Sequence, residues 1–248
     1  MKNDFTLQGY ETLLKQALDS GYQFCSFENI YQENLDKICY LRHDIDADVT
    51  AAFKLAEIEN SLGVRATYFF MLRSPVYNLF SRFNQKLVER IIKLDHHIAL
   101  HFDENFACER PEPLQNQIER ELDILNSNFG INTNIVSFHQ PSERILQNKI
   151  QLKNIIHTYD KPLFKDIHYV SDSNKNWRND HPFDTFKEQT VDKIQLLIHP
   201  MWWVFEKNYN TRTVWKKTLI NNFNLMQNQI LETEGAFGGA VEIKLKDK

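Results

Sequence analysis

Hydrophobic and polar residues alternate along this chain in blocks that fit strands and helices in turn. Short, nearly continuous apolar runs bounded by polar residues predict buried strands at residues 37–46, 66–72, 97–102, 135–139, 166–172 and 193–199. Longer stretches with apolar residues three or four positions apart predict amphipathic helices at residues 51–62, 87–94 and 114–129. Gly63 and Gly130 follow two of these stretches, where a glycine commonly ends a helix.

A last periodic stretch lies nearer the C-terminal end. Its apolar residues are spaced as on one face of a long helix, namely Trp215, Leu219, Phe223, Met226 and Ile230. We interpret this stripe, like those of the other helices, as part of the core, with no role in binding a cofactor.

Alternating strands and helices with apolar strands predict a parallel sheet covered by helices. Six or more such strands favour a closed or nearly closed β/α barrel. The chain of 248 residues, 42% of them hydrophobic, is long enough for one large core. We therefore expect a single domain over residues 1–248.

Composition and charge exclude several classes of function. The net charge of −4 is made of interspersed signs, which favours neither nucleic-acid binding nor a membrane surface. Residues 1–11 lack the apolar region of a secretory signal, and no apolar run is long enough for a transmembrane segment. The three cysteines are widely spaced, which is typical of a reducing cytoplasm. We expect a cytoplasmic protein, and the sequence leaves its oligomeric state open.

Acidic residues and histidines gather where the predicted strands end. They are Asp44, Asp46, His101, His139, Asp172 and His199. In a β/α barrel the carboxyl ends of the strands converge on one face, which is where active sites lie. We expect these side chains to meet there, although they are spread over most of the chain.

Two of these carboxylates, Asp44 and Asp46, point the same way if the strand continues through them. Like charges held together resist joint ionisation unless an arginine or a metal ion compensates them. Arg42, on the same strand face, is one such group, and Asp48 is expected only to cap the next helix. Mixed histidine and carboxylate ligation suits a divalent metal, zinc above all, and a nearby carboxylate and histidine would then act as general base and acid.

Six segments resemble, in order and spacing, those of the polysaccharide deacetylase family, also called the NodB homology domain. They read LRHDID, ATYFFML, HHIALHFD, SFHQPS, YVSDSNKNWR and LLIHPMWW. The resemblance is to the cytoplasmic branch that serves surface-polysaccharide biosynthesis. It implies a distorted (β/α) barrel of about seven parallel strands, with an N-terminal helical segment, residues 1–36, packed on the barrel. It also implies metal-dependent removal of an acyl group, usually acetyl, from an N-acylated sugar.

The resemblance assigns roles to particular residues. Asp44 matches the general base, Asp46 a metal ligand and His199 the general acid. His101 matches the first histidine ligand of the second motif. The second ligand of that motif falls at Asn105, a poor metal ligand.

Two histidines could replace the missing ligand. His139, at the end of the next strand, is preferred, because His97 lies roughly 13 Å from His101 along an extended chain. A helical conformation of this segment would favour His97 instead.

The resemblance implies further residues around the site. An arginine of the third motif is replaced by Gln140, and Arg42 is a stand-in. Asp172 and Trp177 match residues that support the site, and Arg178 is a candidate contact to an anionic substrate.

These features favour a zinc-dependent deacetylase acting on a small saccharide or on a nucleotide- or lipid-linked sugar. A hydrolase of another amide or C–N bond in a small non-sugar substrate is the first alternative, because a fold does not fix a substrate. A metal-free, inactive relative that serves as a binding module is the second, and Asn105 and Gln140 are the residues that favour it.

Overall fold

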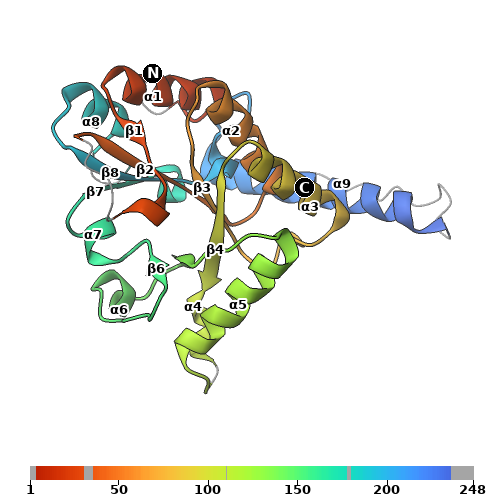
Figure 1. Ribbon diagram of the computed structural model, residues 1–248. Coiled ribbons are helices and arrows are strands. Elements are labelled where there is room, and N and C mark those ends of the chain that lie inside the picture. Colours follow the sequence, from red (N-terminus) through yellow and green to blue (C-terminus); the bar gives the residue numbers. More distant parts are fainter. Residues whose placement is uncertain (1–3, 31–35, 110, 178–179, 236–248) are drawn as a thin grey trace.

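The computed structural model of the protein describes residues 4–30, 36–109, 111–177 and 180–235 (Figure 1). Seven strands form one sheet in the order β6-β5-β4-β3-β2-β8-β7, and a short eighth strand, β1, pairs with β2. All strand pairs in the described part of the chain are parallel. The strands are β1 (Gln23–Phe24), β2 (Ile38–Ile45), β3 (Thr67–Phe70), β4 (His97–Asp103), β5 (Ile135–His139), β6 (Ile156–His157), β7 (His168–Ser171) and β8 (Lys193–Ile198).

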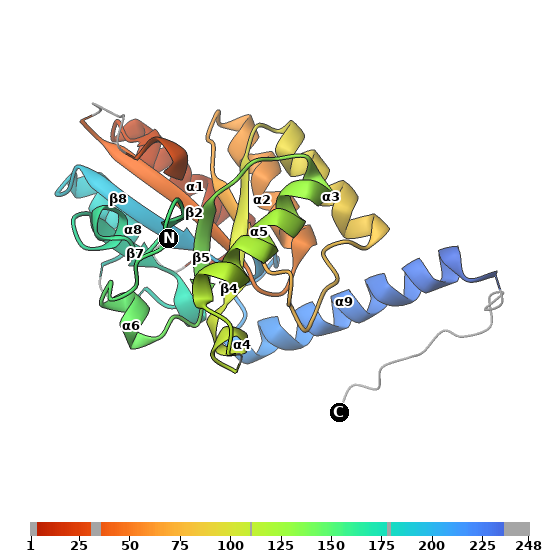
Figure 2. The same cartoon turned by 60° about the horizontal axis from the view of Figure 1, so that its bottom comes forward.

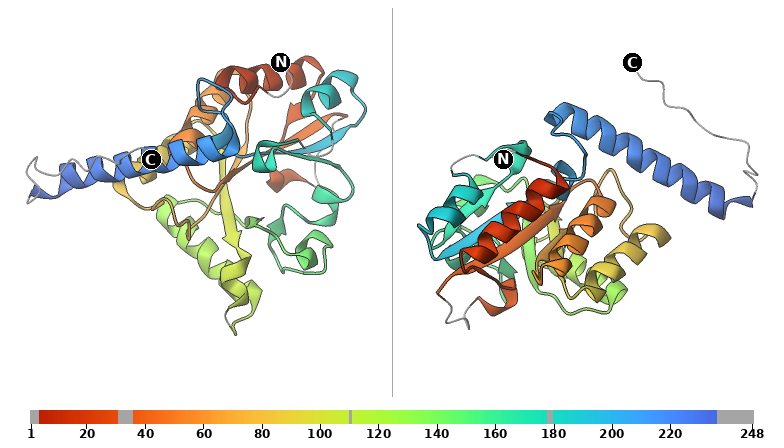
Figure 3. Two further views of the ribbon diagram at one scale, coloured as in Figure 1. Left: turned by 180° about the vertical axis from the view of Figure 1, so that it is seen from behind. Right: turned by 90° about the horizontal axis from the view of Figure 1, so that it is seen from above.

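The helices lie mainly on the outer side of this curled sheet (Figures 1 and 3). They are α1 (Leu7–Asp19), α2 (Val49–Ser61), α3 (Arg82–Lys93), α4 (Glu104–Cys108), α5 (Leu114–Phe129), α6 (Glu143–Leu146), α7 (Lys161–Phe164), α8 (Pro182–Glu188) and α9 (Thr211–Thr233). Strands β6 and β7 are the two ends of the sheet in the described part of the chain. The predicted fold class is therefore confirmed as a β/α half-barrel with seven parallel strands in its main sheet.

All six predicted strands are present, and their character explains why they could be recognised. Every residue of β2 is buried, as expected for a central strand covered on both faces. The strands that the apolar pattern did not indicate, β1 and β6, have two residues each, which is too short for any periodicity.

Local signals at the helix ends act as the sequence predicted. The Asp48 carboxylate accepts a hydrogen bond from the backbone N–H of Ala51 at the start of α2. Gly130 has a φ of 65° and ends α5 in the left-handed conformation that glycine adopts without strain. None of the described helices combines the length and hydrophobicity that crossing a membrane requires.

The interpretation of the apolar stripe of α9 as core holds for Trp215, which packs against the core, and is wrong for the exposed Leu219, Met226 and Ile230. Leu219 is 46% exposed and Met226 is 51% exposed, whereas only Val214 and Thr218 of this helix are buried. Figure 2 shows why, because α9 runs along the edge of the body and its C-terminal half extends past it. A periodic apolar pattern predicts a helix with one apolar face, but it does not reveal whether the same chain covers that face.

A polar cluster fills the space between the sheet and helices α1 and α2. Glu59 of α2 is fully buried and accepts hydrogen bonds from the hydroxyls of Tyr10 and Tyr68. His43 of β2 lies 2.6 Å from the same carboxylate. Burial acts to raise the pKa of Glu59, but His43 and the other donors outweigh it and lower this pKa. The cluster therefore holds an ionised carboxylate inside the core.

Replacing Glu59 with alanine is expected to lower the free energy of unfolding by about 3 kcal/mol, because the buried partners lose their acceptor. The lowered pKa makes this contribution complete above the ordinary carboxyl value of 4.5 and smaller as the pH falls through the folded value. Urea unfolding at several pH values measures it. Glu57→Ala, at a half-exposed site on the same helix, is the control, and an equal loss in both variants would contradict the role given to Glu59.

Candidate active site

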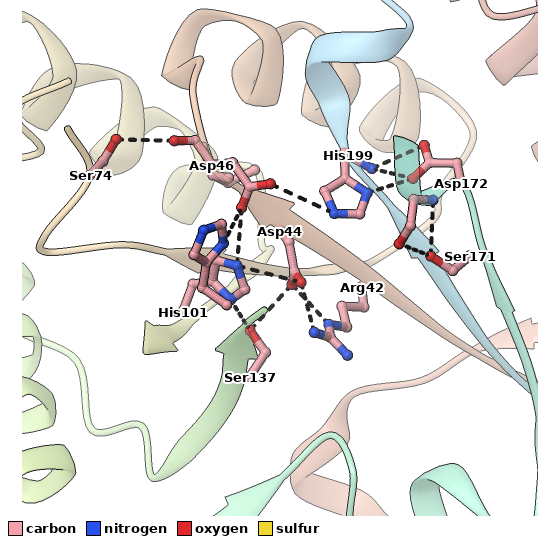
Figure 4. Close-up of polar contacts among 12 residues, drawn as sticks. Arg42, Asp44, Asp46, Ser74, His101, Ser137, Ser171, Asp172 and His199 are labelled. Carbon is pink, nitrogen blue, oxygen red and sulfur yellow. Dashed lines mark hydrogen bonds and ion pairs between the residues drawn. The ribbon is translucent and has the colours of Figure 1, made fainter. Parts of the chain in front are cut away.

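The polar residues at the strand ends surround one cavity of about 840 Å³. Figure 4 shows their side chains converging from β2, β4, β5 and the β7–β8 pair. The predicted residues that line this cavity are Asp44, Asp46, His101, His139 and His199. They meet because parallel strands bring their carboxyl ends to the same edge of the sheet.

Three of these residues form a set of possible metal ligands. Asp46 follows β2 directly, and its Oδ1 lies 3.0 Å from Nε2 of His101 and 3.4 Å from Nδ1 of His139. One ligand atom from each of the three lies within 4.8 Å of the others. Atoms that each lie about 2.0–2.2 Å from one zinc ion are separated from one another by distances comparable to those among these three residues. The donor set therefore fits a divalent cation.

Hydrogen bonding fixes which ring atom of His101 faces this set. Nδ1 of His101 lies 2.7 Å from the hydroxyl of Ser137, and that hydroxyl donates its one proton to Asp44 at 3.2 Å. Ser137 can therefore only accept from Nδ1–H of His101. Nε2 is left facing the carboxylate of Asp46, and two such acceptors 3.0 Å apart need a proton or a cation between them.

Electrostatics keep the Asp46 carboxylate ionised. Burial acts to raise the pKa of Asp46, but hydrogen bonds with His101 and His139 and the charge of His199 lower it well below its ordinary range. An anionic oxygen beside two imidazoles is therefore available to a cation at neutral pH.

Asp44 is held by a buried arginine two residues earlier on the same strand. Arg42 is fully buried and donates two hydrogen bonds to the Asp44 carboxylate, from Nε at 2.8 Å and from Nη2 at 2.7 Å. Tyr159 and Gln195 hold the other side of the guanidinium. Burial acts to raise the pKa of Asp44, and Arg42 outweighs it and lowers this pKa. The two like charges at the end of β2 are thus compensated separately.

His199 is oriented by Asp172. Nδ1 of His199 lies 2.6 Å from Oδ1 of Asp172, and this carboxylate also accepts hydrogen bonds from the backbone N–H of His199 and from the indole of Trp203. Nε2 of His199 faces the cavity, 3.8 Å from Asp46. Burial acts to lower the pKa of His199, but Asp172 and Asp46 outweigh it and raise the pKa to about 9.

The alternative third ligand, His97, lies elsewhere. Residues 97–103 form an extended strand, so His97 is at the opposite end of β4 from His101. Its Nδ1 lies 3.7 Å from Glu28. Asn105 is exposed in the short helix α4. His139 is the histidine that the fold brings beside Asp46 and His101.

Of the further residues that the sequence predicted around the site, some lie at the cavity and others do not. Gln140 lines the cavity with a φ of 46°, and Asp172 supports His199. Trp177 stacks on Phe5 at 5.7 Å between ring centroids and is not among the described residues that line the cavity. Arg178 lies outside the described residues.

The sequence analysis missed several structural partners of the site. Ser137 lies two positions before His139, so strand alternation places both on one face, a signal that was available. Glu104, which is buried, accepts hydrogen bonds from Ser142 and Arg144 and so anchors the loop after His139. These contacts join residues 38 and 40 positions apart, for which the sequence carries no local signal.

No protein-family model and no curated protein sequence matches this chain. Among solved structures, deacetylase PplD of Streptococcus pyogenes matches 84% of this chain and 85% of its own, with 14% identity and a TM-score of 0.44. The catalytic domain of a peptidoglycan N-acetylglucosamine deacetylase from Eubacterium rectale matches 76% and 87%, with 16% identity and a TM-score of 0.44. Peptidoglycan deacetylase PdaC of Bacillus subtilis matches 83% and 98%, with 14% identity and a TM-score of 0.42. All three similarities are distant.

Proposed function

We propose that this protein is a metal-dependent hydrolase that removes an N-acyl group, acetyl in the simplest case, from a sugar or a sugar-linked precursor. The observation that carries the proposal is the placement of three different groups around one cavity. They are the Asp46–His101–His139 donor set, the Asp44 carboxylate fixed by Arg42, and the His199 imidazole fixed by Asp172.

The donor set favours zinc as the cation. Two imidazoles and one carboxylate, with positions left for water and substrate, are the ligands of many catalytic zinc sites. A divalent cation held by these residues would polarise the acyl carbonyl and acidify the attacking water.

Asp44 and His199 divide the proton transfers between them. Asp44, ionised because Arg42 lowers its pKa, takes a proton from the water that attacks the acyl carbon. His199, protonated at neutral pH because Asp172 raises its pKa, gives the proton on Nε2 to the departing nitrogen. The C–N bond breaks, and the products are a carboxylate and a free amine.

The substrate class rests on the resemblance of the six sequence segments and on the shape of the site. The cavity of about 840 Å³ is large enough for a sugar with part of its neighbouring group. Aromatic side chains line it, among them Tyr159, Tyr169 and Trp202, and they offer flat apolar surfaces beside the polar centre. A cytoplasmic biosynthetic substrate, either a small saccharide or a nucleotide- or lipid-linked sugar, follows from the branch that the segments resemble.

The test is acetate release by the full chain after chelation and after zinc is restored. Substrates should include free, nucleotide-linked and lipid-linked N-acetyl sugars, with small non-sugar acetamides beside them. We expect zinc-dependent release from at least one N-acetyl sugar. Acetate release only from non-sugar amides would show that the proposed substrate class is wrong. A chain that binds no divalent metal would contradict the proposal altogether.

A further inference from the structure

Exposed apolar residues concentrate on helix α9. Six large hydrophobic side chains of the described residues are exposed, and four of them belong to this helix, namely Leu219, Met226, Ile230 and Leu231. Figures 2 and 3 show that the C-terminal half of α9 extends away from the body of the protein. Such a group of apolar side chains is a candidate interaction surface.

The apolar side chains of α9 that are exposed lie on a different side of the helix from the residues that contact the body. Val214 and Thr218 are buried, and the side-chain amide of Asn222 donates hydrogen bonds to the backbone carbonyls of Ala47 and Val76. These three residues, four apart, form one helical row.

The apolar stripe, Leu219–Phe223–Met226–Ile230, lies about a third of a turn around the helix from that row. Its spacings of four, three and four residues are those of a seam between two paired helices.

Charge along α9 indicates what covers this stripe. Residues 218–231 contain no charged side chain. Basic residues, Arg212, Lys216 and Lys217, lie at the start of the helix, and acidic residues, Glu232 and Glu234, lie at its end. A second α9 running antiparallel would bring the basic end of each helix beside the acidic end of the other.

We propose that the stripe of α9 packs against the same stripe of a second copy of this chain, in an antiparallel, two-fold symmetric pair. The neutral central segment lets the two identical surfaces meet without repulsion of like charges. A two-fold axis between Asn224 and Leu225 places Leu219 opposite Ile230, and Phe223 opposite Met226. The same register sets Lys216 beside Glu234 of the second copy.

A membrane surface is the other occupant to test. An amphipathic helix that binds anionic lipid usually carries lysine and arginine along its polar face. The central 14 residues of α9, 218–231, carry none. This composition favours a second copy over a lipid surface.

Sedimentation equilibrium of the full chain over a concentration series tests the pairing. Because the seam covers only two heptads, we expect a reversible monomer–dimer equilibrium in the micromolar range, on the order of 10 µM. Met226→Glu is expected to weaken dimerisation by at least about 10-fold. Ile124→Glu, at a site 44% exposed on α5, is the matched control and should leave it unchanged.

A monomer at every concentration up to about 200 µM, roughly 20 times the expected midpoint, would overturn the proposal. A dimer equally stable in Met226→Glu would also overturn it. Binding of the monomer to anionic vesicles, lost in Met226→Glu, would assign the stripe to a membrane instead.

Cysteine cross-linking tests the direction of the pair. In the proposed register two Met226→Cys side chains lie about 4.5 Å apart along the axis, and two Leu219→Cys side chains about 16 Å apart. We expect Met226→Cys to cross-link with itself, and Leu219→Cys only with Ile230→Cys in a mixture. The unsubstituted chain controls for its own thiols. Efficient self-cross-linking of Leu219→Cys would show a parallel pair and overturn the antiparallel proposal.

Discussion

Replacing Asp46 with alanine is expected to abolish stoichiometric binding of a divalent metal and to lower hydrolysis by more than about 1,000-fold. Asp46 is the only carboxylate of the donor set, and it lies within 3.4 Å of a nitrogen of each histidine. Its removal leaves only the two imidazoles, a weaker site for a cation. Metal content after dialysis and the initial rate of acyl release measure the two effects.

Asp180→Asn is the control for this prediction. Asp180 lines the same cavity but is not part of the donor set. The control should keep its metal. An Asp46→Ala variant that retains one metal per chain would show that the ligands of the metal are other residues.

Asp44→Asn should separate catalysis from metal binding. It removes the proposed base and keeps the shape of the side chain, so we expect a fall in kcat of about 100- to 10,000-fold with the metal retained. Arg42 would then be a buried charge without its partner, which is expected to cost about 3 kcal/mol of stability.

Unfolding therefore has to be measured beside kcat in Asp44→Asn. A folded, metal-loaded variant with more than about a tenth of the wild-type kcat would identify another group as the base. Loss of metal in the same variant would instead make Asp44 a ligand.

The strand ends could be predicted because two simple patterns coincide there. Apolar runs marked β2, β4 and β5, and each run finishes in an acid or a histidine. In a parallel sheet such ends share one edge, so Asp46, His101 and His139 could be expected to meet. The preference for His139 over His97 as the third ligand depended only on whether residues 97–103 are extended. They form strand β4 and are therefore extended.

Other features depend on contacts that no local pattern contains. Trp177 follows a turn with left-handed residues at Asn174 and Lys175, and the path of that turn directs its ring toward Phe5. The exposure of Leu219 in α9 depends on whether the body extends that far, which a helical period cannot indicate.

The burial of Glu59 is another feature that no local sequence pattern could predict. On an amphipathic helix a glutamate is ordinarily expected at the surface. Its burial is possible because Tyr10, Tyr68 and His43 supply hydrogen bonds from three other elements. Such a network is assembled by the tertiary fold and leaves no periodic trace in the sequence.

The central claim is that the ends of β2, β4 and β5 hold one metal ion. Diffraction from crystals grown with zinc, recorded on both sides of the zinc absorption edge, tests it most directly. We expect one anomalous peak in the cavity, enclosed by Asp46, His101 and His139. An empty cavity at saturating zinc, or a peak held by His97 and Glu28 at the other end of β4, would contradict it.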